Sequence, residues 1–296
     1  MTFNAYLDGY LRDVRSGIRK TARGRDFAEG TIYTISGTVM LLKAYQEDTR
    51  RHLDFRDIDL EFYRNFVAYL KDKGYRTNTV GKYVSTLKTI LGEAESDGVN
   101  SYMTYKDKKF KVLHEPTSNI YLTDEEVFKI YNLDLSGMSE CYGKARDLFI
   151  IGICTAQRVS DFTQFRKEDV FRLEDGHFYI KIIQKKTGKT VCIPCNSTLR
   201  ELMVKYNFVV PKMPPQHINK YIKIVAEMAG LGDKAARITT HTARRTGATL
   251  MYLAGMDLTD VMTITGHSSL AMLKVYIKAD EIDIVEKIVK KYNFFD

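Results

Sequence analysis

The sequence has few cysteines and no long hydrophobic segment. It contains four cysteines in 296 residues (Cys141, Cys154, Cys192 and Cys195), too few for a secreted disulfide scaffold of this length. No apolar run approaches the roughly 20 residues that a membrane-spanning helix needs, and the N-terminus lacks the hydrophobic region of a signal peptide. These absences argue against a disulfide scaffold or a membrane partner, and they predict a soluble, cytoplasmic protein.

The sequence also lacks the signatures of nucleotide and metal cofactors. It has no Walker A loop, no dinucleotide-binding fingerprint and no acidic cluster suited to Mg²⁺. Cys192 and Cys195 form a C-x-x-C pair, but no second cysteine or histidine pair stands at the spacing of a zinc ribbon. Because Pro194 between them fits the end of a strand, we expect a buried strand here, and we expect neither a metal nor a cofactor.

Length and charge suggest two domains and a polyanionic partner. At 296 residues the chain is longer than most single domains. Its formal net charge is +8, and a basic excess favours nucleic acid because Lys and Arg contacts to phosphates release condensed counterions. By itself this charge is a weak argument, since many ordinary proteins are as basic.

The first hundred residues predict a bundle of four short helices. Apolar residues recur at helical spacing over residues 2–18, 31–45, 59–74 and 77–98. Asp59 is a suitable N-cap for the third helix, and Gly74 is a suitable C-terminal stop. We therefore assign residues 1–112 to a helical domain.

Residues 100–119 break this pattern and predict a linker between the domains. The segment contains Lys106, Lys108, Lys109 and Lys111. These four lysines make it basic enough to lie along a phosphate backbone, so they are candidate DNA contacts. From composition alone, a solvated surface loop is equally well supported.

Residues 120–296 predict a second domain of mixed content. Thr123 and Glu126 form a capping box that opens a helix, and the apolar helix around 145–154 should be buried. Further helical patterns cover residues 215–229 and 241–254 and, at the C-terminus, Glu281 to Tyr292.

Within this domain the period changes from helix to strand. Phe178 to Gln184 and Thr190 to Ile193 read as two strands, joined by the sequence Lys-Lys-Thr-Gly-Lys of residues 185–189. Gly188 suits a tight turn, so the segment predicts a β-hairpin with lysines near its tip. The fold class is therefore mainly α with a small β-hairpin or sheet (α+β).

Six residues of the second domain are those that phosphoryl transfer without a metal would need. They are Arg158, Lys186, His241, Arg244, His267 and Tyr276. Guanidinium groups stabilise charge on the non-bridging oxygens of a phosphate, and a tyrosine can attack phosphorus to form a phosphotyrosyl bond. A lysine can protonate the leaving 5′-oxygen, and the histidines can accept the tyrosine proton, orient the phosphate or donate to a non-bridging oxygen.

The spacing of these residues supports the grouping. His241 and Arg244 are three residues apart, so on one helix they share a face. Arg158 and Asp161 have the same spacing, and Asp161 could hold a neighbouring basic group in place. Arg245, beside Arg244, is better suited to a DNA-backbone or structural contact.

At these motifs the sequence resembles the tyrosine recombinase (phage integrase) family. The matching segments are residues 155–161, 185–189, 241–247 and 265–269, followed by Tyr276. The resemblance covers about the C-terminal three-fifths by motif, and the N-terminal bundle fits by architecture alone. The sequence has Ala156-Gln157 where the family often has Gly-Leu, and Thr265 where Leu or Ile is common. Neither departure removes a functional group, so we expect small effects.

The resemblance implies a site-specific DNA recombinase of the integrase, excisionase or invertase type, encoded by a mobile element or a bacterial chromosome. Strands would be cleaved and rejoined through a 3′-phosphotyrosyl intermediate and a Holliday junction. A core-binding bundle and a catalytic domain would form a C-shaped clamp on double-stranded DNA with an inverted-repeat core site. The implied assembly is a homo-tetramer in the bacterial cytoplasm at the nucleoid, and the resemblance allows an accessory DNA-bending protein as a further partner. The helix from Glu281 to Tyr292 would contact a neighbouring protomer or pack on its own domain.

The sequence leaves two alternative functions, and two alternatives to Lys186 in the hairpin. A type IB topoisomerase uses related tyrosine chemistry but usually has Lys in place of His241. A non-catalytic DNA-binding regulator on the same scaffold would be expected to lose at least one of the six groups, and none is missing. In the hairpin, Lys185 and Lys189 are alternatives to Lys186 as the residue that reaches the scissile phosphate.

Overall fold

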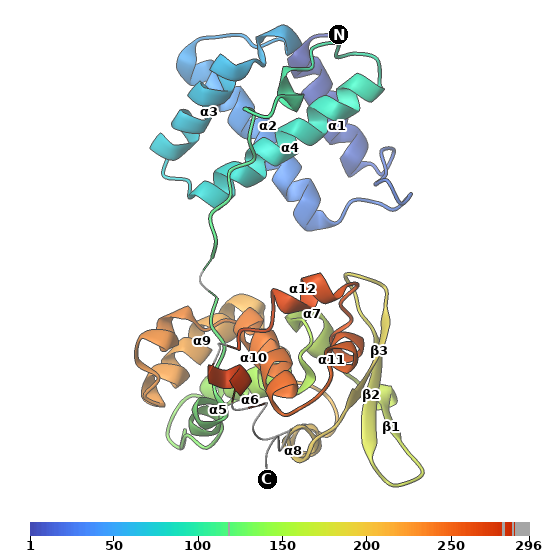
Figure 1. Cartoon of the computed structure of the whole chain (residues 1–296), viewed down its shortest axis with the longest axis vertical. Helices are drawn as coiled ribbons and strands as arrows, with labels where there is room; N and C mark the ends of the chain where they lie inside the picture. The colour runs from blue at the N-terminus through green and yellow to red at the C-terminus, as the bar shows by residue number, and fades with distance from the viewer. Residues whose placement is uncertain (118, 280–281, 286, 288–296) are drawn as a thin grey trace. The chain divides into compact units, whose positions relative to one another are not determined.

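The computed structural model describes residues 1–117, 119–279, 282–285 and 287. The chain divides into two compact units, Met1–Thr117 and Ser118–Asp296, and helices predominate in both (Figure 1). The predicted fold class, mainly helical with a small sheet, is confirmed. No helix within the described residues is long and apolar enough to cross a bilayer.

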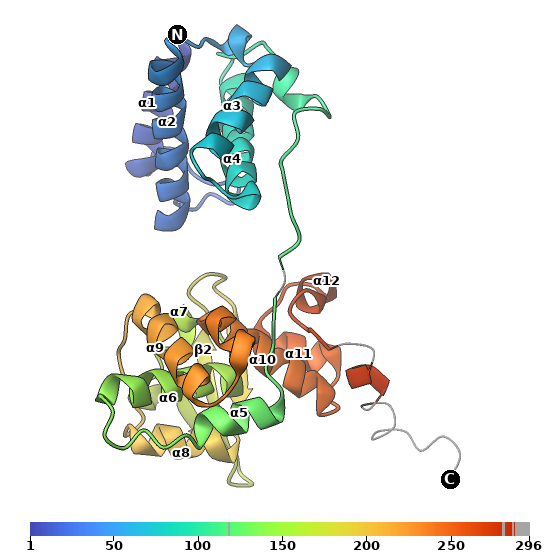
Figure 2. The same cartoon turned by 90° about the vertical axis from the view of Figure 1, so that its left-hand side faces the viewer.

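The first unit is a bundle of four helices, as predicted. They are α1 (Phe3–Arg15), α2 (Glu29–Thr49), α3 (Leu60–Asp72) and α4 (Thr77–Ser96), and Figure 2 shows α1 and α2 beside α3 and α4. Their apolar stripes meet in one core, in which Leu7, Leu42 and Leu87 are fully buried. Asp59 caps α3 by accepting a hydrogen bond from the Phe62 amide at 2.7 Å.

Much of the predicted linker packs onto this bundle. Tyr105 and Phe110 are buried in its core, and the Tyr63 hydroxyl donates to the Lys111 carbonyl oxygen at 2.9 Å. Gly81 on α4 makes room for the chain, because a Cβ there would lie 1.9 Å from the Leu113 carbonyl oxygen. Tyr105 and Phe110, which adjoin lysines in the sequence, therefore anchor residues 105–113 to the first unit.

The second unit surrounds the buried helix α6 (Glu140–Thr155). Before it, α5 (Asp124–Tyr131) starts at the predicted capping box, in which Thr123 and Glu126 exchange both hydrogen bonds. Further helices of this unit are α7 (Val159–Phe162), α8 (Ser197–Lys205), α9 (Pro215–Met228), α10 (Thr240–Leu253), α11 (Leu258–Thr265) and α12 (Leu270–Lys274).

A three-stranded antiparallel sheet lies at one edge of this unit, with α11 beside β3 (Figure 1). Strands β2 (Phe178–Ile183) and β3 (Thr190–Pro194) are the predicted hairpin, and β1 (Val170–Arg172) pairs with the outer side of β2. Along β3 the burial alternates, so Val191 and Ile193 face the core while Cys192 is exposed. The strand predicted at the C-x-x-C pair is present, but Cys192 itself is not buried.

The contact between α6 and α10 positions much of the site. Gly247 on α10 faces the end of α6 so closely that a Cβ would lie 2.1 Å from the Ile153 carbonyl oxygen. Gly152 on α6 likewise lies against α10, with Ala243 Cβ 3.1 Å from where its own Cβ would be. Small residues at both positions let the helix backbones approach, which brings Arg244 to the C-terminus of α6.

Most of the helix predicted from Glu281 to Tyr292 lies outside the described residues. Within residues 282–285 and 287, two side chains contact their own unit. The Tyr121 hydroxyl donates to Asp283 Oδ2 at 2.5 Å, and Lys287 Nζ lies 3.2 Å from the centroid of the Tyr252 ring.

Candidate active site

Arg158 lies at the turn between α6 and α7, where it precedes the first residue of α7. The turn is possible because Ala156 adopts a left-handed conformation (φ +49°), which ends α6. Arg158 Nη1 lies 3.8 Å from Asp161 Oδ2, and the Asp161 side chain is fully buried. The other carboxylate oxygen of Asp161 accepts a hydrogen bond from the Lys185 backbone amide at 2.9 Å. Asp161 therefore links Arg158 to the lysine hairpin.

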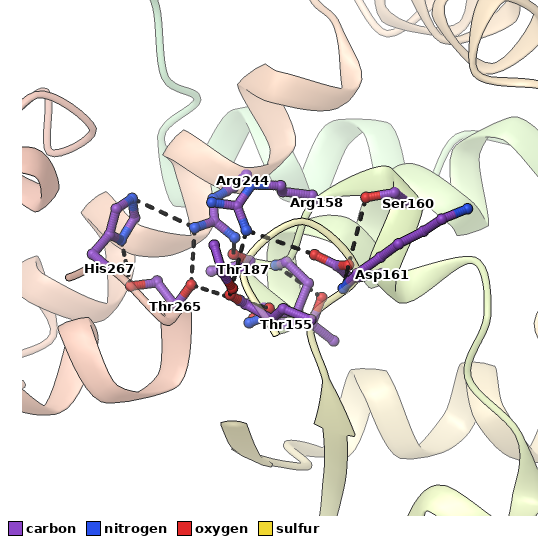
Figure 3. Close-up of polar contacts among 12 residues, drawn as sticks. Thr155, Arg158, Ser160, Asp161, Thr187, Arg244, Thr265 and His267 are labelled. Atoms are coloured by element: carbon purple, nitrogen blue, oxygen red, sulfur yellow. Dashed lines mark hydrogen bonds and ion pairs between the residues drawn. The ribbon is translucent and has the colours of Figure 1, made fainter. Parts of the chain in front are cut away.

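Arg244, on α10, is completely buried. Its Nη1 donates to the Ala156 carbonyl oxygen at 3.0 Å, and its Nη2 donates to the Thr265 carbonyl oxygen at 2.9 Å. These acceptors belong to the C-terminal ends of α6 and α11, where carbonyl groups are left without helical partners and favour a cation. Figure 3 shows the guanidinium groups of Arg158 and Arg244 between His267 on one side and Asp161 on the other.

His267 directly follows Gly266, which ends α11 in a left-handed conformation at φ +72°. The Thr265 hydroxyl donates to the Val261 carbonyl oxygen, so the contact of 2.7 Å between Thr265 Oγ1 and His267 Nδ1 assigns the ring proton to Nδ1. His267 Nε2 then accepts from Arg244 Nη2 at 3.4 Å. Burial, followed by the cations Arg244, Arg158 and Lys189, lowers the pKa of His267 to about 4.

Tyr276 follows α12 and is half-buried against the same groups. Its ring centroid lies 4.7 Å from that of His267, with an interplanar angle of 56°. The guanidinium carbons of Arg244 and Arg245 lie 5.4 Å and 5.6 Å from the same centroid. The tyrosine ring thus lies against one histidine and two arginines.

His241 and Lys186 lie on the more open side of the site, and both are exposed. Partial desolvation lowers the pKa of His241, and four nearby cations lower it further: Arg245, Arg244, Arg158 and Lys186. This interaction places the Lys186 ammonium group within electrostatic range of His241. Of the two alternative lysines, Lys185 is held by its backbone amide, and Lys189 Nζ donates to the His267 carbonyl oxygen at 3.2 Å.

Comparison with known protein families gives a match to most of the second unit. Residues 121–282 match the model described as the phage integrase family. The chain belongs to the phage integrase family. Its first unit agrees, because residues 3–112 match the phage integrase SAM-like domain.

Curated relatives of this integrase-family chain are tyrosine recombinases of low sequence identity. XerC of Staphylococcus carnosus is 25% identical, and the match covers 83% of this chain and 86% of the relative. XerD of Listeria monocytogenes serotype 4b is 23% identical, covering 85% and 92%.

Solved structures show the same fold. A lambda integrase dimer bound to a COC′ core site gives a TM-score of 0.72 at 19% identity, covering 100% of this chain and 99% of that chain. The Tn1549 transposon integrase in complex with a circular intermediate DNA gives 0.71 at 17%, covering 99% and 100%.

The six predicted groups of this integrase-family chain lie on α10, in the β2–β3 hairpin, and next to the ends of α7, α11 and α12. Contacts join Arg244, His267 and Tyr276 to one another, and Gln184 and Asp161 link Arg158 to the hairpin. Sequence reasoning missed the polar residues between them. Gln157 and Gln184 are fully buried and bond to each other, and Thr265 carries the hydroxyl that orients His267. A signal was present for two of these three residues, because Gln157 and Thr265 belong to the departures from the family pattern, which are Ala156-Gln157 and Thr265.

The predicted DNA-contact lysines belong to the first unit. Lys106 Nζ is paired with Glu95 Oε1 at 2.6 Å, so its charge is partly neutralised within the unit. Lys108, Lys109 and Lys111 are exposed. In the second unit, the half-buried Arg245 contacts Tyr276 and has a buried Nε without a hydrogen-bond partner. Among the described residues, no group of three or more His, Cys, Asp or Glu side chains is arranged to hold a metal ion.

Proposed function

We propose that this chain is a site-specific DNA recombinase that cleaves and rejoins DNA strands through Tyr276. The observation that carries the proposal is the position of the Tyr276 ring, 4.7 Å from His267 and 5.4 Å from the Arg244 guanidinium. A nucleophile for a phosphodiester must lie beside the groups that bind the phosphate oxygens, and Tyr276 lies beside two such groups.

In the proposed cleavage step, His241 and Lys186 carry the protons. Tyr276 Oη attacks phosphorus while the bond from phosphorus to the 5′-oxygen breaks. His241 accepts the tyrosine proton, because its lowered pKa leaves the imidazole neutral near pH 7. Lys186 gives a proton to the departing 5′-oxygen. The products are a 3′-phosphotyrosyl bond and a free 5′-hydroxyl, and the bond energy is kept for rejoining.

Arg158 and Arg244 bind the non-bridging oxygens in this proposal. Arg244 is held by two backbone carbonyl groups, which leaves other N–H groups of its guanidinium for a phosphate. Arg158 is 16% exposed at its side chain, so it has access to solvent and to a ligand. Two fixed guanidinium groups stabilise the charge that develops on the pentacoordinate phosphorus without a metal ion.

For rejoining, the 5′-hydroxyl of a partner duplex attacks the phosphorus, the bond from phosphorus to Tyr276 Oη breaks, the hydroxyl proton passes to Lys186, and His241 returns a proton to the tyrosine. Two such rounds pass through a Holliday junction. Among the structural neighbours is a lambda integrase tetramer bound to a Holliday junction. By analogy we propose a homo-tetramer on double-stranded DNA with an inverted-repeat core site. The helical unit and the catalytic unit would close on the duplex as a clamp, with Lys108, Lys109 and Lys111 along the phosphate backbone. An accessory DNA-bending protein, action in the bacterial cytoplasm, and docking of residues 281–292 on a neighbouring protomer belong to the same proposal.

The first test is covalent capture of DNA. The protein is mixed with end-labelled DNA flanking its own gene and quenched in SDS, and a slow, protease-sensitive band is sought. We expect the band with the native protein and with Tyr221→Phe, a half-buried tyrosine on α9 that serves as the matched control. We expect none with Tyr276→Phe. Sequencing the adduct ends then locates the site and its spacer.

The alternatives give different results in the same assay. A band that persists in Tyr276→Phe would show that the nucleophile is another residue. Tight DNA binding without any adduct, on a library of flanking fragments, favours a non-catalytic regulator. Relaxation of supercoiled plasmid without exchange between two sites favours a topoisomerase.

A further inference from the structure

We propose that Gln184 is a positioning residue, whose carboxamide fixes the hairpin that carries Lys186 against Arg158 and the His267 turn. The inference rests on the proposed function, because it concerns how the leaving-group lysine is held. Gln184 lies at the end of β2, one residue before the lysine loop, and it is fully buried.

Every hydrogen-bonding position of the Gln184 carboxamide is used. Its Nε2 donates to Gln157 Oε1 at 2.7 Å and to the Thr265 carbonyl oxygen at 2.9 Å. Its Oε1 accepts from Thr187 Oγ1 at 2.7 Å and from Arg158 Nη1 at 3.4 Å. One side chain therefore connects the arginine turn, the end of α11 and the hairpin loop.

These bonds hold the loop on both sides of Lys186. On one side, the Lys185 amide donates to Asp161, and on the other the Thr187 hydroxyl donates to Gln184. The Gln184 backbone also closes the loop, since its amide donates to the Lys189 carbonyl oxygen and its carbonyl oxygen accepts from the Gly188 amide, both at 2.8 Å. Lys186 itself is exposed and is placed only through these neighbours.

The surroundings of Gln184 are tightly matched to it. Gly266 has no space for a side chain, because a Cβ there would lie 2.5 Å from Gln184 Oε1. Thr265 gives its carbonyl oxygen to both Gln184 and Arg244, so a shift of Gln184 also reaches Arg244. Gln157, the other partner, is a position at which the sequence departs from its family pattern. The four hydrogen bonds of the Gln184 side chain therefore include one to a residue that departs from the family pattern.

A buried glutamine that only stabilises the fold is the competing explanation, and Gln46 provides the matched control. Gln46 lies in the helical unit, is 7% exposed, and also makes four side-chain hydrogen bonds, to Asn4 (two), Leu42 and Leu53. The variants are Gln184→Met and Gln46→Met, which keep the shape of the side chain. Thr187→Val is the milder second variant, because it removes only the hydroxyl that bonds Gln184.

The first measurement needs no DNA. Trypsin cleavage after Lys185 and Lys186 is followed in the full chain under native conditions. Loss of the one hydrogen bond from Thr187 should raise the open population of the loop, and with it the cleavage rate, by about fivefold in Thr187→Val, and Gln184→Met should show at least as large an increase. Gln46→Met should leave these sites at the native rate. Unchanged cleavage in both hairpin variants would overturn the proposal, whatever the protein does to DNA.

The second measurement uses the site-containing fragment recovered by covalent capture. At saturating DNA, we expect single-turnover cleavage by Gln184→Met to slow by about tenfold or more, with a change in Kd below about threefold. A substrate with sulfur in place of the bridging 5′-oxygen tests the cause, because a thiolate leaves without being protonated. Gln184→Met and the native protein should cleave it at rates within about threefold of each other.

The two proposals fail in different ways. If native protein and Gln46→Met give no adduct with any flanking fragment, the proposed function fails and trypsin still decides whether Gln184 holds the hairpin. If native protein cleaves and the Gln184→Met defect persists on the sulfur substrate, Gln184 does not act through Lys186 and the inference is wrong. Thr187→Val should slow single-turnover cleavage less than Gln184→Met does, and its cleavage rate should also recover on the sulfur substrate.

Discussion

The ring of Tyr276 lies over the guanidinium group of Arg244, with 5.4 Å between the ring centroid and Cζ. Arg244 is completely buried, and His267 contacts both residues. The proposed nucleophile therefore covers the proposed phosphate-binding group. In the proposed function, a phosphate that binds Arg244 would approach the guanidinium beside this ring. The cation–π contact holds the ring beside the guanidinium.

Arg244→Lys should abolish most cleavage and also destabilise the protein. Lysine cannot donate to the Ala156 and Thr265 carbonyl oxygens in the forked geometry of a guanidinium. Removing one preorganised donor costs about 10²–10³ in rate, and each buried acceptor left unpaired costs about 1–3 kcal/mol. Single-turnover cleavage and urea unfolding measure the two effects. Arg245→Lys is the control, because Arg245 is only half-buried; an equal loss of stability there would show that the carbonyl bonds are not the cause.

His267 should make the protein less stable in mild acid. Its folded-state pKa, about 4, lies below the ordinary value of 6.5, so the unfolded chain binds the proton more readily. The stabilisation is therefore complete above pH 6.5 and is lost as the pH falls toward 4. Between pH 7 and pH 5 this linkage amounts to about 2 kcal/mol. Urea unfolding at both pH values, on native protein and His267→Gln, isolates it. The variant should lose less stability over this interval, and an identical loss would assign the acid sensitivity elsewhere.

Gly266→Ala should be more damaging than an ordinary glycine substitution. The left-handed backbone alone costs an alanine about 1 kcal/mol, and the collision with Gln184 adds about 1–3 kcal/mol. Gly230→Ala is the matched control, since Gly230 has φ +77° and nothing lies within 4 Å of its Cβ position. Chemical unfolding should show the difference between the variants. Equal destabilisation would mean that Gln184 moves aside without cost.

The elements that the sequence predicts are those with a regular local pattern. The four amphipathic helices of the first unit, the hairpin and the capping box at Thr123 all follow from spacing that repeats over neighbouring residues. Strand β1 (Val170–Arg172) was not predicted, because three residues are too few to show alternation. It forms by pairing with β2, a partner that local sequence does not specify.

The candidate site likewise has a part that the sequence predicts and a part that depends on tertiary packing. Its charged groups follow from motifs, but the burial of Arg244 does not, since an arginine is usually exposed. Its acceptors at Ala156 and Thr265 are 88 and 21 residues away in sequence, and only the packing of α6, α10 and α11 brings them together. The Gln184 network was missed for the same reason, because Gln157 and Thr265 are 27 and 81 residues from it.

Alanine substitutions of the three hairpin lysines should have clearly different effects on the cleavage rate. Lys186→Ala should slow cleavage by about 10²–10³ and should recover on the substrate with a bridging sulfur. Lys185→Ala should cleave nearly normally, because the bond from residue 185 to Asp161 comes from the backbone amide, which alanine keeps. Lys189→Ala loses the bond from Nζ to the His267 carbonyl oxygen, so a modest defect without sulfur rescue is expected.

A titration without DNA provides an independent check on the same lysine. Lys186 is among the cations that lower the pKa of His241, so Lys186→Ala should move that pKa back toward its ordinary value. NMR titration of the imidazole, with Lys185→Ala as the control, measures the change. If instead Lys189→Ala shows both the large defect and the sulfur rescue, Lys189 is the proton donor. The bond from Lys189 to His267 would then have to break before the lysine reaches the leaving 5′-oxygen.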